Sequence, residues 1–196
     1  FQEKIKLNLM EKLTGLKKFK TAVFISGTGS NLKNLIKFSK KKKTPISIDL
    51  IISNTNKAKG LMYANQAKIK KKIFNFQNIK NSEKKILLLL KKEKINFICL
   101  AGFMKILSED FIERFKGKII NIHPSLLPKY KGIKTHERAI KNKDKYAGCT
   151  VHYVNAKLDS GEIIIQKKVK VTTKDNPTSL AKKVLKQEHK LYPAAI

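Results

Sequence analysis

From Thr21 onward the chain alternates short apolar runs with amphipathic segments, and this alternation constrains the fold more than any other feature. The apolar runs have the length of strands, and the segments between them carry apolar residues at helical spacing. Strands that alternate with helices build units in which neighbouring strands run parallel. The sequence therefore predicts an α/β fold with a Rossmann-like, mostly parallel central sheet flanked by helices.

The expected strands cover residues 21–25, 46–53, 73–76, 97–101, 118–122, 148–154 and 162–171. One helix is expected between the first strand and Pro45. Further helices are expected at residues 61–67, 82–92, 108–115 and 135–142, and a last one after Asn176. Asn176 suits an N-cap, and Pro177 suits the first helical position. A chain of 196 residues has room for one such domain, which we expect at residues 21–196 behind an amphipathic lead-in at residues 1–20.

The charge of the chain is strongly positive, with 44 Lys and Arg against 14 Asp and Glu. Such an excess is typical of proteins that bind nucleic acid or an anionic membrane. Only Arg114 and Arg138 are arginines, however, and the lysines are scattered instead of clustered. Base recognition favours arginine, so we interpret the charge as compositional and expect neither nucleic acid nor membrane as a partner. A positive field still attracts small phosphorylated molecules.

Cys99 and Cys149 lie far apart and outside any Cys-x-x-Cys pattern, so we expect neither a disulfide framework nor a metal site. Unpaired cysteines fit a reducing compartment, and we expect a cytoplasmic protein. The apolar runs are also too short to span a bilayer.

The first strand runs into the glycine-rich segment Gly27–Leu32, which opens an amphipathic helix. Free backbone N–H groups at such a helix start bind anions, so Gly29, Ser30 and Asn31 are candidates to hold a phosphate. A plain strand-to-helix turn with a polar cap explains the same residues equally well. A dinucleotide fingerprint would need glycine where Leu32 stands, and no Gly-Lys-Ser/Thr element of a P-loop is present.

The segment Asn121-Ile122-His123-Pro124 ends a predicted strand. Residues two apart in a strand face the same side, so Asn121 and His123 are expected to project together at the carboxyl end of the sheet. An amide can stabilise a developing oxyanion, and an imidazole can carry a proton near neutral pH. The pair is therefore a candidate catalytic site. The alternative is that both side chains only satisfy the backbone of the following loop.

An amine that attacks a carbonyl must lose a proton, and a charged partner would raise the pKa of the histidine. Asp159, in the turn Leu158–Gly161, is the candidate carboxylate. Aspartate before a glycine is also common in turns without any function. His152 reads as a strand residue whose ring is satisfied locally.

Taken together, several segments of the chain resemble the folate-dependent formyltransferases, in particular those that formylate phosphoribosylglycinamide in purine synthesis. The matching stretches are residues 25–32 (ISGTGSNL), 100–108 (LAGFMKILS), 121–132 (NIHPSLLPKYKG), 135–136 (TH), 158–161 (LDSG) and 187–189 (QEH). The resemblance runs from about Thr21 to the end of the sequence, with the segments in the order of the family.

The resemblance implies an enzyme that moves the formyl group of 10-formyltetrahydrofolate onto the amine of 5'-phosphoribosylglycinamide, without a metal. It assigns the substrate phosphate to Gly29, Ser30 and Asn31, and the ribose to Glu188. The folate would contact residues along one segment and beside it: Met104, Lys105, Ile106, Leu107 and Asn121. Asn121, His123 and Asp159 would be catalytic, with His123 kept protonated by Asp159.

The chain departs from the family at two positions. An arginine that the family often carries near the folate is absent, and Lys80 is the only nearby replacement. Lys134 stands where a histidine is usual.

Three other functions remain as alternatives. Formyl transfer to methionyl-tRNA or to water uses the same core, but those relatives carry an additional domain that we do not expect here. A basic nucleic-acid-binding module would need aromatic platforms or an arginine stripe, which the sequence does not show.

Overall fold

The computed structural model describes residues 18–196, so the lead-in expected at residues 1–20 lies almost wholly outside the described residues. The first strand, β1, begins at Phe19, two residues inside that expected lead-in. Its early start extends the pairing with the neighbouring strand down to Ile46.

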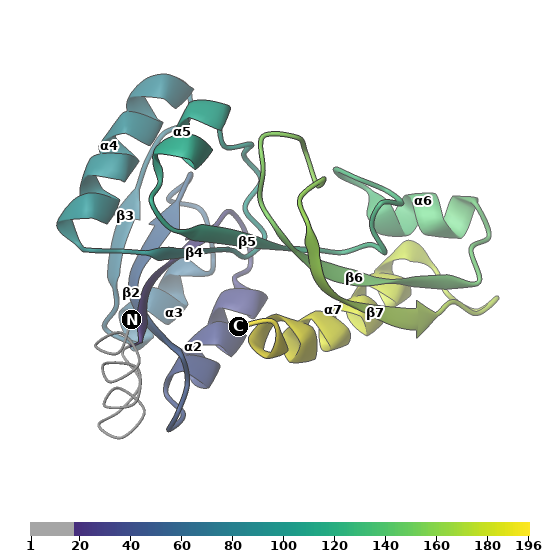
Figure 1. The fold of residues 1–196 in the computed structure, drawn as a ribbon. Helices are drawn as coiled ribbons and strands as arrows, with labels where there is room; N and C mark the ends of the chain where they lie inside the picture. The colour runs from purple at the N-terminus through teal and green to yellow at the C-terminus, as the bar shows by residue number, and fades with distance from the viewer. Residues whose placement is uncertain (1–17) are drawn as a thin grey trace, which may run out of the picture.

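The described chain forms one seven-stranded sheet with the order β3-β2-β1-β4-β5-β6-β7 (Figure 1). The strands are β1 (Phe19–Ile25), β2 (Ile46–Ser53), β3 (Lys70–Ile73), β4 (Phe97–Leu100), β5 (Lys118–His123), β6 (Tyr146–Tyr153) and β7 (Ile163–Lys170). The first five strands in chain order pair in parallel, whereas β6 and β7 join antiparallel at one edge. The predicted mostly parallel α/β sheet is therefore confirmed.

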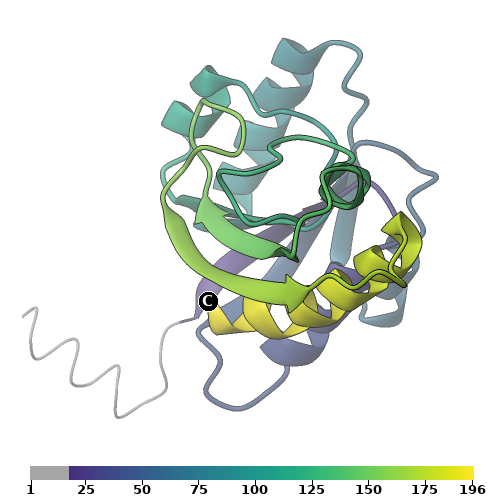
Figure 2. The same ribbon diagram turned by 90° about the vertical axis from the view of Figure 1, so that its right-hand side faces the viewer.

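Helices cover both faces of the sheet, as Figures 1 and 2 show from two directions. One face packs against α2 (Ser30–Ser39), α3 (Leu61–Gln66) and α7 (Pro177–Ala194), and the other packs against α4 (Ile79–Lys92) and α5 (Glu109–Arg114). The short helix α6 (Thr135–Lys141) packs against α7 and β6.

The alternation of side chains along β1 divides the apolar core in two. Val23 and Ile25 face the cluster under α2 and α7, whereas Ala22 and Phe24 face the cluster under α4 and α5. A strand segment buried on both faces needs apolar residues at every position, which is why the second half of β1, Ala22 to Ile25, is a continuous apolar run. The two layers fix the carboxyl ends of β1, β4 and β5 beside one another.

Two predicted boundaries are wrong. The third strand was expected at residues 73–76 but covers Lys70–Ile73, where three lysines precede its only apolar residue. An exposed edge strand pairs through its backbone, so its side chains need no apolar pattern. Helix α4 starts at Ile79 instead of residue 82, because Asn78 caps it by accepting a hydrogen bond from the N–H of Asn81.

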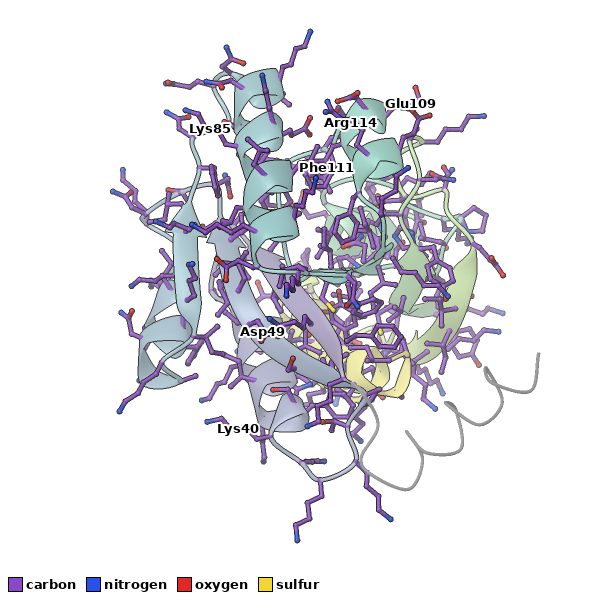
Figure 3. The ribbon with its side chains drawn as sticks, turned by 60° about the vertical axis from the view of Figure 1, so that its left-hand side comes forward. Lys40, Asp49, Lys85, Glu109, Phe111 and Arg114 are labelled. Carbon is purple, nitrogen blue, oxygen red and sulfur yellow. The ribbon has the colours of Figure 1, made fainter. Side chains whose placement is uncertain are left out.

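The lysines lie on the outside of the molecule, as Figure 3 shows for Lys40 at the end of α2 and Lys85 on α4. Phe111 turns inward from α5 and is fully buried, while Glu109 and Arg114 on the same helix face outward. The positive charge is thus spread over several elements. Across residues 18–196, no helix combines the length and the apolar character needed to cross a membrane.

Candidate active site

Asn121 and His123 lie at the carboxyl end of β5, where Pro124 ends the strand. The neighbouring strand β6 runs antiparallel and places His152 directly opposite Asn121. The Nδ2 atom of Asn121 lies 3.2 Å from Nε2 of His152. The polar side chains therefore gather at the edge of the sheet where open α/β folds bind their ligands.

Asp159 reaches the same point from the loop between β6 and β7. Its Oδ2 atom lies 3.4 Å from Nδ1 of His123, and its Oδ1 atom lies 3.6 Å from Nε2 of His152. The backbone N–H of Gly132 donates a further hydrogen bond of 2.8 Å to Oδ2. The side chains of Asp159 and both histidines are almost completely buried, so these contacts are only weakly screened by water.

The backbone around Asp159 is shaped for this position. Asp159 has a φ of 45°, in the left-handed region that aspartate tolerates better than most residues. Two residues later, a side chain at Gly161 would place its Cβ atom 1.7 Å from the carbonyl oxygen of Tyr153, so only glycine lets the loop approach β6 this closely. The turn residues that looked unremarkable in the sequence therefore carry the carboxylate to the histidines.

His152 belongs to this cluster, although the sequence alone indicated a strand residue satisfied locally. Its Nδ1 atom contacts the carbonyl oxygen of Tyr153 at 2.7 Å and must donate there. Nε2 lies 3.2 Å from the amide nitrogen of Asn121 and 3.6 Å from Oδ1 of Asp159, so it can accept from Asn121 without a proton and donate to Asp159 with one. The signal that could have found His152 is its place in a strand pairing antiparallel with Asn121.

The contacts of His123 favour the protonated ring. Its Nε2 atom donates to the carbonyl oxygen of Tyr130 at 2.9 Å, and its Nδ1 atom faces the carboxylate of Asp159. Burial nevertheless lowers the pKa of His123 below its ordinary value, although Tyr130 and Asp159 both raise it. Desolvation therefore opposes the charge of Asp159, and the expectation that Asp159 keeps this histidine protonated stays a prediction.

The carboxyl group of Asp159 is shifted toward the ionised form. Burial raises its pKa, but the interactions with His152, Gly132 and His123 together outweigh burial and lower the pKa below the ordinary value. The cluster thus holds a carboxylate beside two imidazoles in a site shielded from water.

A cleft opens beside this cluster. Its lining includes Asn121, His152 and Asp159 from the cluster, together with Lys105, Ile106 and Leu107. Leu100, Phe103, Val154 and Leu158 add apolar surface to the same cleft. Such a mixture suits a flat, largely apolar ligand with a polar reactive group.

Two residues expected beside this cleft lie elsewhere in the structure. Met104 is 68% exposed and is not among the lining residues. Its backbone is nevertheless held in place, because its N–H donates a hydrogen bond to Oγ of Ser26. Lys80 lies in the first turn of α4, exposed to solvent and outside the lining of the cleft.

The glycine-rich segment forms the turn between β1 and α2. Gly29 caps α2 with a φ of 74°, and an added Cβ atom would lie 2.4 Å from Cα of Gly60. Asn31, in the first turn, donates through Nδ2 to Oε2 of Glu188 at 2.7 Å. Its Oδ1 atom is buried and has no hydrogen-bond partner.

Glu188 comes from α7 and is buried beside α2. Burial raises the pKa of its carboxyl group, and the hydrogen bond from Asn31 only partly offsets that effect. The four residues expected to bind the acceptor substrate, Gly29, Ser30, Asn31 and Glu188, are thus brought together from the two ends of the chain. Among residues 18–196, no group of three or more His, Cys, Asp or Glu side chains is arranged to hold a metal ion.

Comparison with known proteins places this site in a family. The family pattern described as formyl transferase matches residues 19–196. Phosphoribosylglycinamide formyltransferase of Haemophilus influenzae is 42% identical over 180 residues, which are 90% of this chain and 85% of that protein. The human trifunctional purine biosynthetic protein adenosine-3 is 43% identical over 92% of the chain, but the chain spans only 18% of that protein's length.

Solved structures agree with the sequence comparison. The crystal structure of phosphoribosylglycinamide formyltransferase from Brucella melitensis superimposes with a TM-score of 0.86 at 42% identity, covering 91% of this chain and 94% of that one. The enzyme from Anaplasma phagocytophilum gives the same TM-score at 41% identity, covering 91% of this chain and 85% of that one.

Proposed function

The chain belongs to the formyl transferase family, and on that basis we propose that it transfers the formyl group of 10-formyltetrahydrofolate to the amine of 5'-phosphoribosylglycinamide in purine synthesis. The observation that carries the proposal is the cluster of Asn121, His123 and Asp159, of which Asn121 and Asp159 line the cleft. The Haemophilus influenzae, Brucella melitensis and Anaplasma phagocytophilum enzymes, of whose lengths the chain covers 85% or more, support this acceptor.

In the proposed reaction the amine nitrogen attacks the formyl carbon directly. A new carbon–nitrogen bond forms, the formyl oxygen becomes an oxyanion, and the bond from the carbon to the folate nitrogen then breaks. The amine loses one proton and the folate nitrogen gains one, so the transfer is balanced in protons. No covalent intermediate with the enzyme is required.

Three side chains have distinct roles in this reaction. Asn121 offers its second amide hydrogen to the oxyanion, since its first is directed at His152. His123 presents Nδ1 to Asp159, because Nε2 is occupied by the carbonyl of Tyr130, and the protonated ring would stabilise the oxyanion by its positive charge. A negative charge developing on the substrate raises the pKa of His123, so the ring becomes protonated where burial alone disfavours it. Asp159, as a carboxylate, balances that charge and can accept the proton of the amine.

The acceptor substrate would bind through its phosphate and ribose. The N–H groups at the start of α2, at Gly29, Ser30 and Asn31, form the phosphate site, and Glu188 accepts from ribose hydroxyls. The unpartnered Oδ1 atom of buried Asn31 supports a site that is completed by a ligand.

The folate would occupy the cleft beside Asn121. Lys105, Ile106 and Leu107 line that cleft and are the residues of the expected folate segment that the geometry supports best. Met104 would contribute only through its backbone, and Lys80 would have to reach the cleft from the outside of α4. The expected domain, residues 21–196, would be the transferring unit.

The choice of acceptor is tested by following the absorbance change when the folate loses its formyl group. Equal concentrations of phosphoribosylglycinamide, methionyl-tRNA or buffer alone are offered to the same enzyme. Turnover that requires phosphoribosylglycinamide supports the proposal. Turnover that is unchanged when the acceptor is left out would identify a hydrolase, and turnover only with the tRNA would identify the other transferase.

We also propose that the partners are small molecules and that the protein works in the cytoplasm. The two cysteines support a reducing compartment, since both are buried free thiols.

A further inference from the structure

Tyr130 links the candidate catalytic histidine to a network outside the cleft. It lies in the loop after β5 and has a φ of 56°, in the left-handed region that tyrosine rarely adopts. In this conformation its carbonyl group contacts His123, while its ring lies beside Arg138 on α6. The residue therefore touches two regions at once.

The carbonyl oxygen of Tyr130 is the acceptor for His123. Nε2 of His123 donates to it at 2.9 Å, and Oγ of Ser125 lies 3.4 Å from the same oxygen. Ser125 also donates to the carbonyl oxygen of Lys129 at 2.6 Å. The position of this one backbone group thus decides which way the ring of His123 turns.

The hydroxyl of Tyr130 is held on the opposite side of the residue. It donates to Oδ2 of Asp144 at 2.8 Å and accepts from Nδ2 of Asn142 at 2.9 Å. The guanidinium of Arg138 lies 4.8 Å from the centre of the ring. Asp144 is in turn bound by Nζ of Lys129 at 3.2 Å, and its side chain is only 14% exposed.

The left-handed conformation is unfavourable for tyrosine, so interactions elsewhere must hold Tyr130 in place. The bond to Asp144 is partly buried, and its acceptor is a carboxylate, which makes it stronger than a hydrogen bond between neutral groups. The loop from Pro124 to Lys134 is also held at Leu127, Lys131 and Gly132 by hydrogen bonds to Thr150, Arg138 and Asp159. The hydroxyl of Tyr130 is the anchor that belongs to the same residue as the carbonyl facing His123.

We propose that Tyr130 and Asp144 are positioning residues for His123: the bond between their side chains fixes the Tyr130 carbonyl, and that carbonyl, by holding Nε2, keeps Nδ1 of His123 facing Asp159. This inference rests on the proposed function for its catalytic consequence. Neither residue touches the cleft beside Asn121.

The charged and titratable groups around His123 come from three elements. They are Asp159 in the loop after β6, His152 on β6, and Arg138 and His136 on α6. None of these is changed in the variants below, so their effect on the ring stays constant.

The test compares Tyr130→Phe and Asp144→Ala with the control Tyr146→Phe, whose hydroxyl sits on a half-exposed ring at the start of β6. The first readout is the NMR titration of His123 without substrates, which is practical because the chain has only four histidines. Assignment comes from His123→Asn. The second readout is kcat and KM for formyl transfer.

Loss of the anchor weakens the bond that favours the protonated ring, so both variants should lower the pKa of His123 and move the alkaline limb of kcat to lower pH. We expect kcat to fall by about tenfold, because a displaced catalytic group loses rate more than binding. KM should change less than about twofold, since neither residue contacts substrate. Tyr146→Phe should match the unchanged protein in both readouts.

Two further variants sharpen the result. Asp144→Asn keeps an oxygen that accepts from the Tyr130 hydroxyl, so it should recover most of the loss seen in Asp144→Ala. The double variant Tyr130→Phe/Asp144→Ala should lose no more kcat than the less active of the two single variants, because the same bond is lost in each case. An unchanged His123 titration in Tyr130→Phe, or additive losses in the double variant, would overturn the proposal. The titration needs no turnover, so it reports on the anchor even if the proposed function fails.

Discussion

Nδ1 of His123 lies 3.4 Å from Oδ2 of Asp159, although one residue ends β5 and the other lies in the turn before β7. The other ring nitrogen of His123 donates to a backbone carbonyl, so both nitrogens face acceptors. A neutral ring can satisfy only one of them. The geometry therefore favours an imidazolium, whereas burial lowers the pKa of His123.

Removal of the carboxylate tests this pairing. Asp159→Asn should lower kcat by about 10²- to 10⁴-fold, because the imidazolium loses its counter-charge and the amine loses its base. The exposed acid Asp110 on α5 provides a control, since Asp110→Asn should leave kcat unchanged. Circular dichroism and the thermal midpoint should match among all three proteins. A turnover of Asp159→Asn within about twofold of the unchanged protein would remove Asp159 from the mechanism.

The phosphate site is tested by two neighbouring glycines. Gly29→Ala should raise KM for the phosphorylated acceptor and lower stability, because φ is 74° and the new Cβ atom would collide with Gly60. Gly27→Ala is the matched control: its added Cβ atom meets nothing within 4 Å. Isothermal titration with the acceptor separates binding from folding. Equal acceptor affinity in the two variants would contradict a phosphate site at Gly29.

Glu188 should lower the stability of the protein without ligand and strengthen the binding of the acceptor. Burial raises the pKa of this carboxyl group, so keeping it charged at neutral pH destabilises the protein without ligand. Glu188→Gln keeps an acceptor for Asn31 and should raise the thermal midpoint at pH 8 by roughly a few degrees. The same change should weaken acceptor binding, because an amide is a poorer partner for ribose hydroxyls. A lower midpoint together with unchanged binding would argue against both statements.

The histidines predict how stability depends on pH. Burial lowers the pKa of His123, His136 and His189, so the unfolded chain takes up protons first as the pH falls. The folded state should therefore lose stability from about pH 6.5 downward, through the lowered pKa values. Urea midpoints at pH 7.5 and 5.5 measure this loss.

The raised pKa of Glu188 increases the stability of the folded state as the pH falls, which opposes the effect of the histidines. The urea midpoints at the two pH values are therefore compared in the Glu188→Gln protein. His136→Asn and His189→Asn together should reduce the loss between the two pH values. A midpoint that stays constant or increases at pH 5.5 would contradict the assignment.

Most of the fold could be predicted from local patterns, and the exceptions have a physical cause. β1 and β4 are buried on both faces and appear in the sequence as continuous apolar runs. The edge strand β3 is held by backbone pairing to β2, so its Lys70–Ile73 sequence carries no apolar signal. Boundaries of exposed elements depend on single hydrogen bonds, such as the cap at Asn78.

Local geometry could predict only the contacts of the site that lie on a single strand. Asn121 and His123 are two residues apart, and strand geometry alone places them together. His152 enters the site through strand pairing, and Asp159 enters through a turn of left-handed backbone against β6. Neither relationship is encoded by spacing along the chain. The low pKa of His123 also depends on how deeply the folded protein buries the ring.

The most direct test of the account is a single-turnover experiment with 10-formyltetrahydrofolate labelled in the formyl carbon and with phosphoribosylglycinamide as acceptor. The account predicts that the label appears on the glycinamide nitrogen with the unchanged protein. With folded His123→Ala, the rate of label transfer should be lower by about 10²- to 10⁴-fold. Label that never reaches the acceptor, or that reaches it equally fast without the imidazole, would contradict the account.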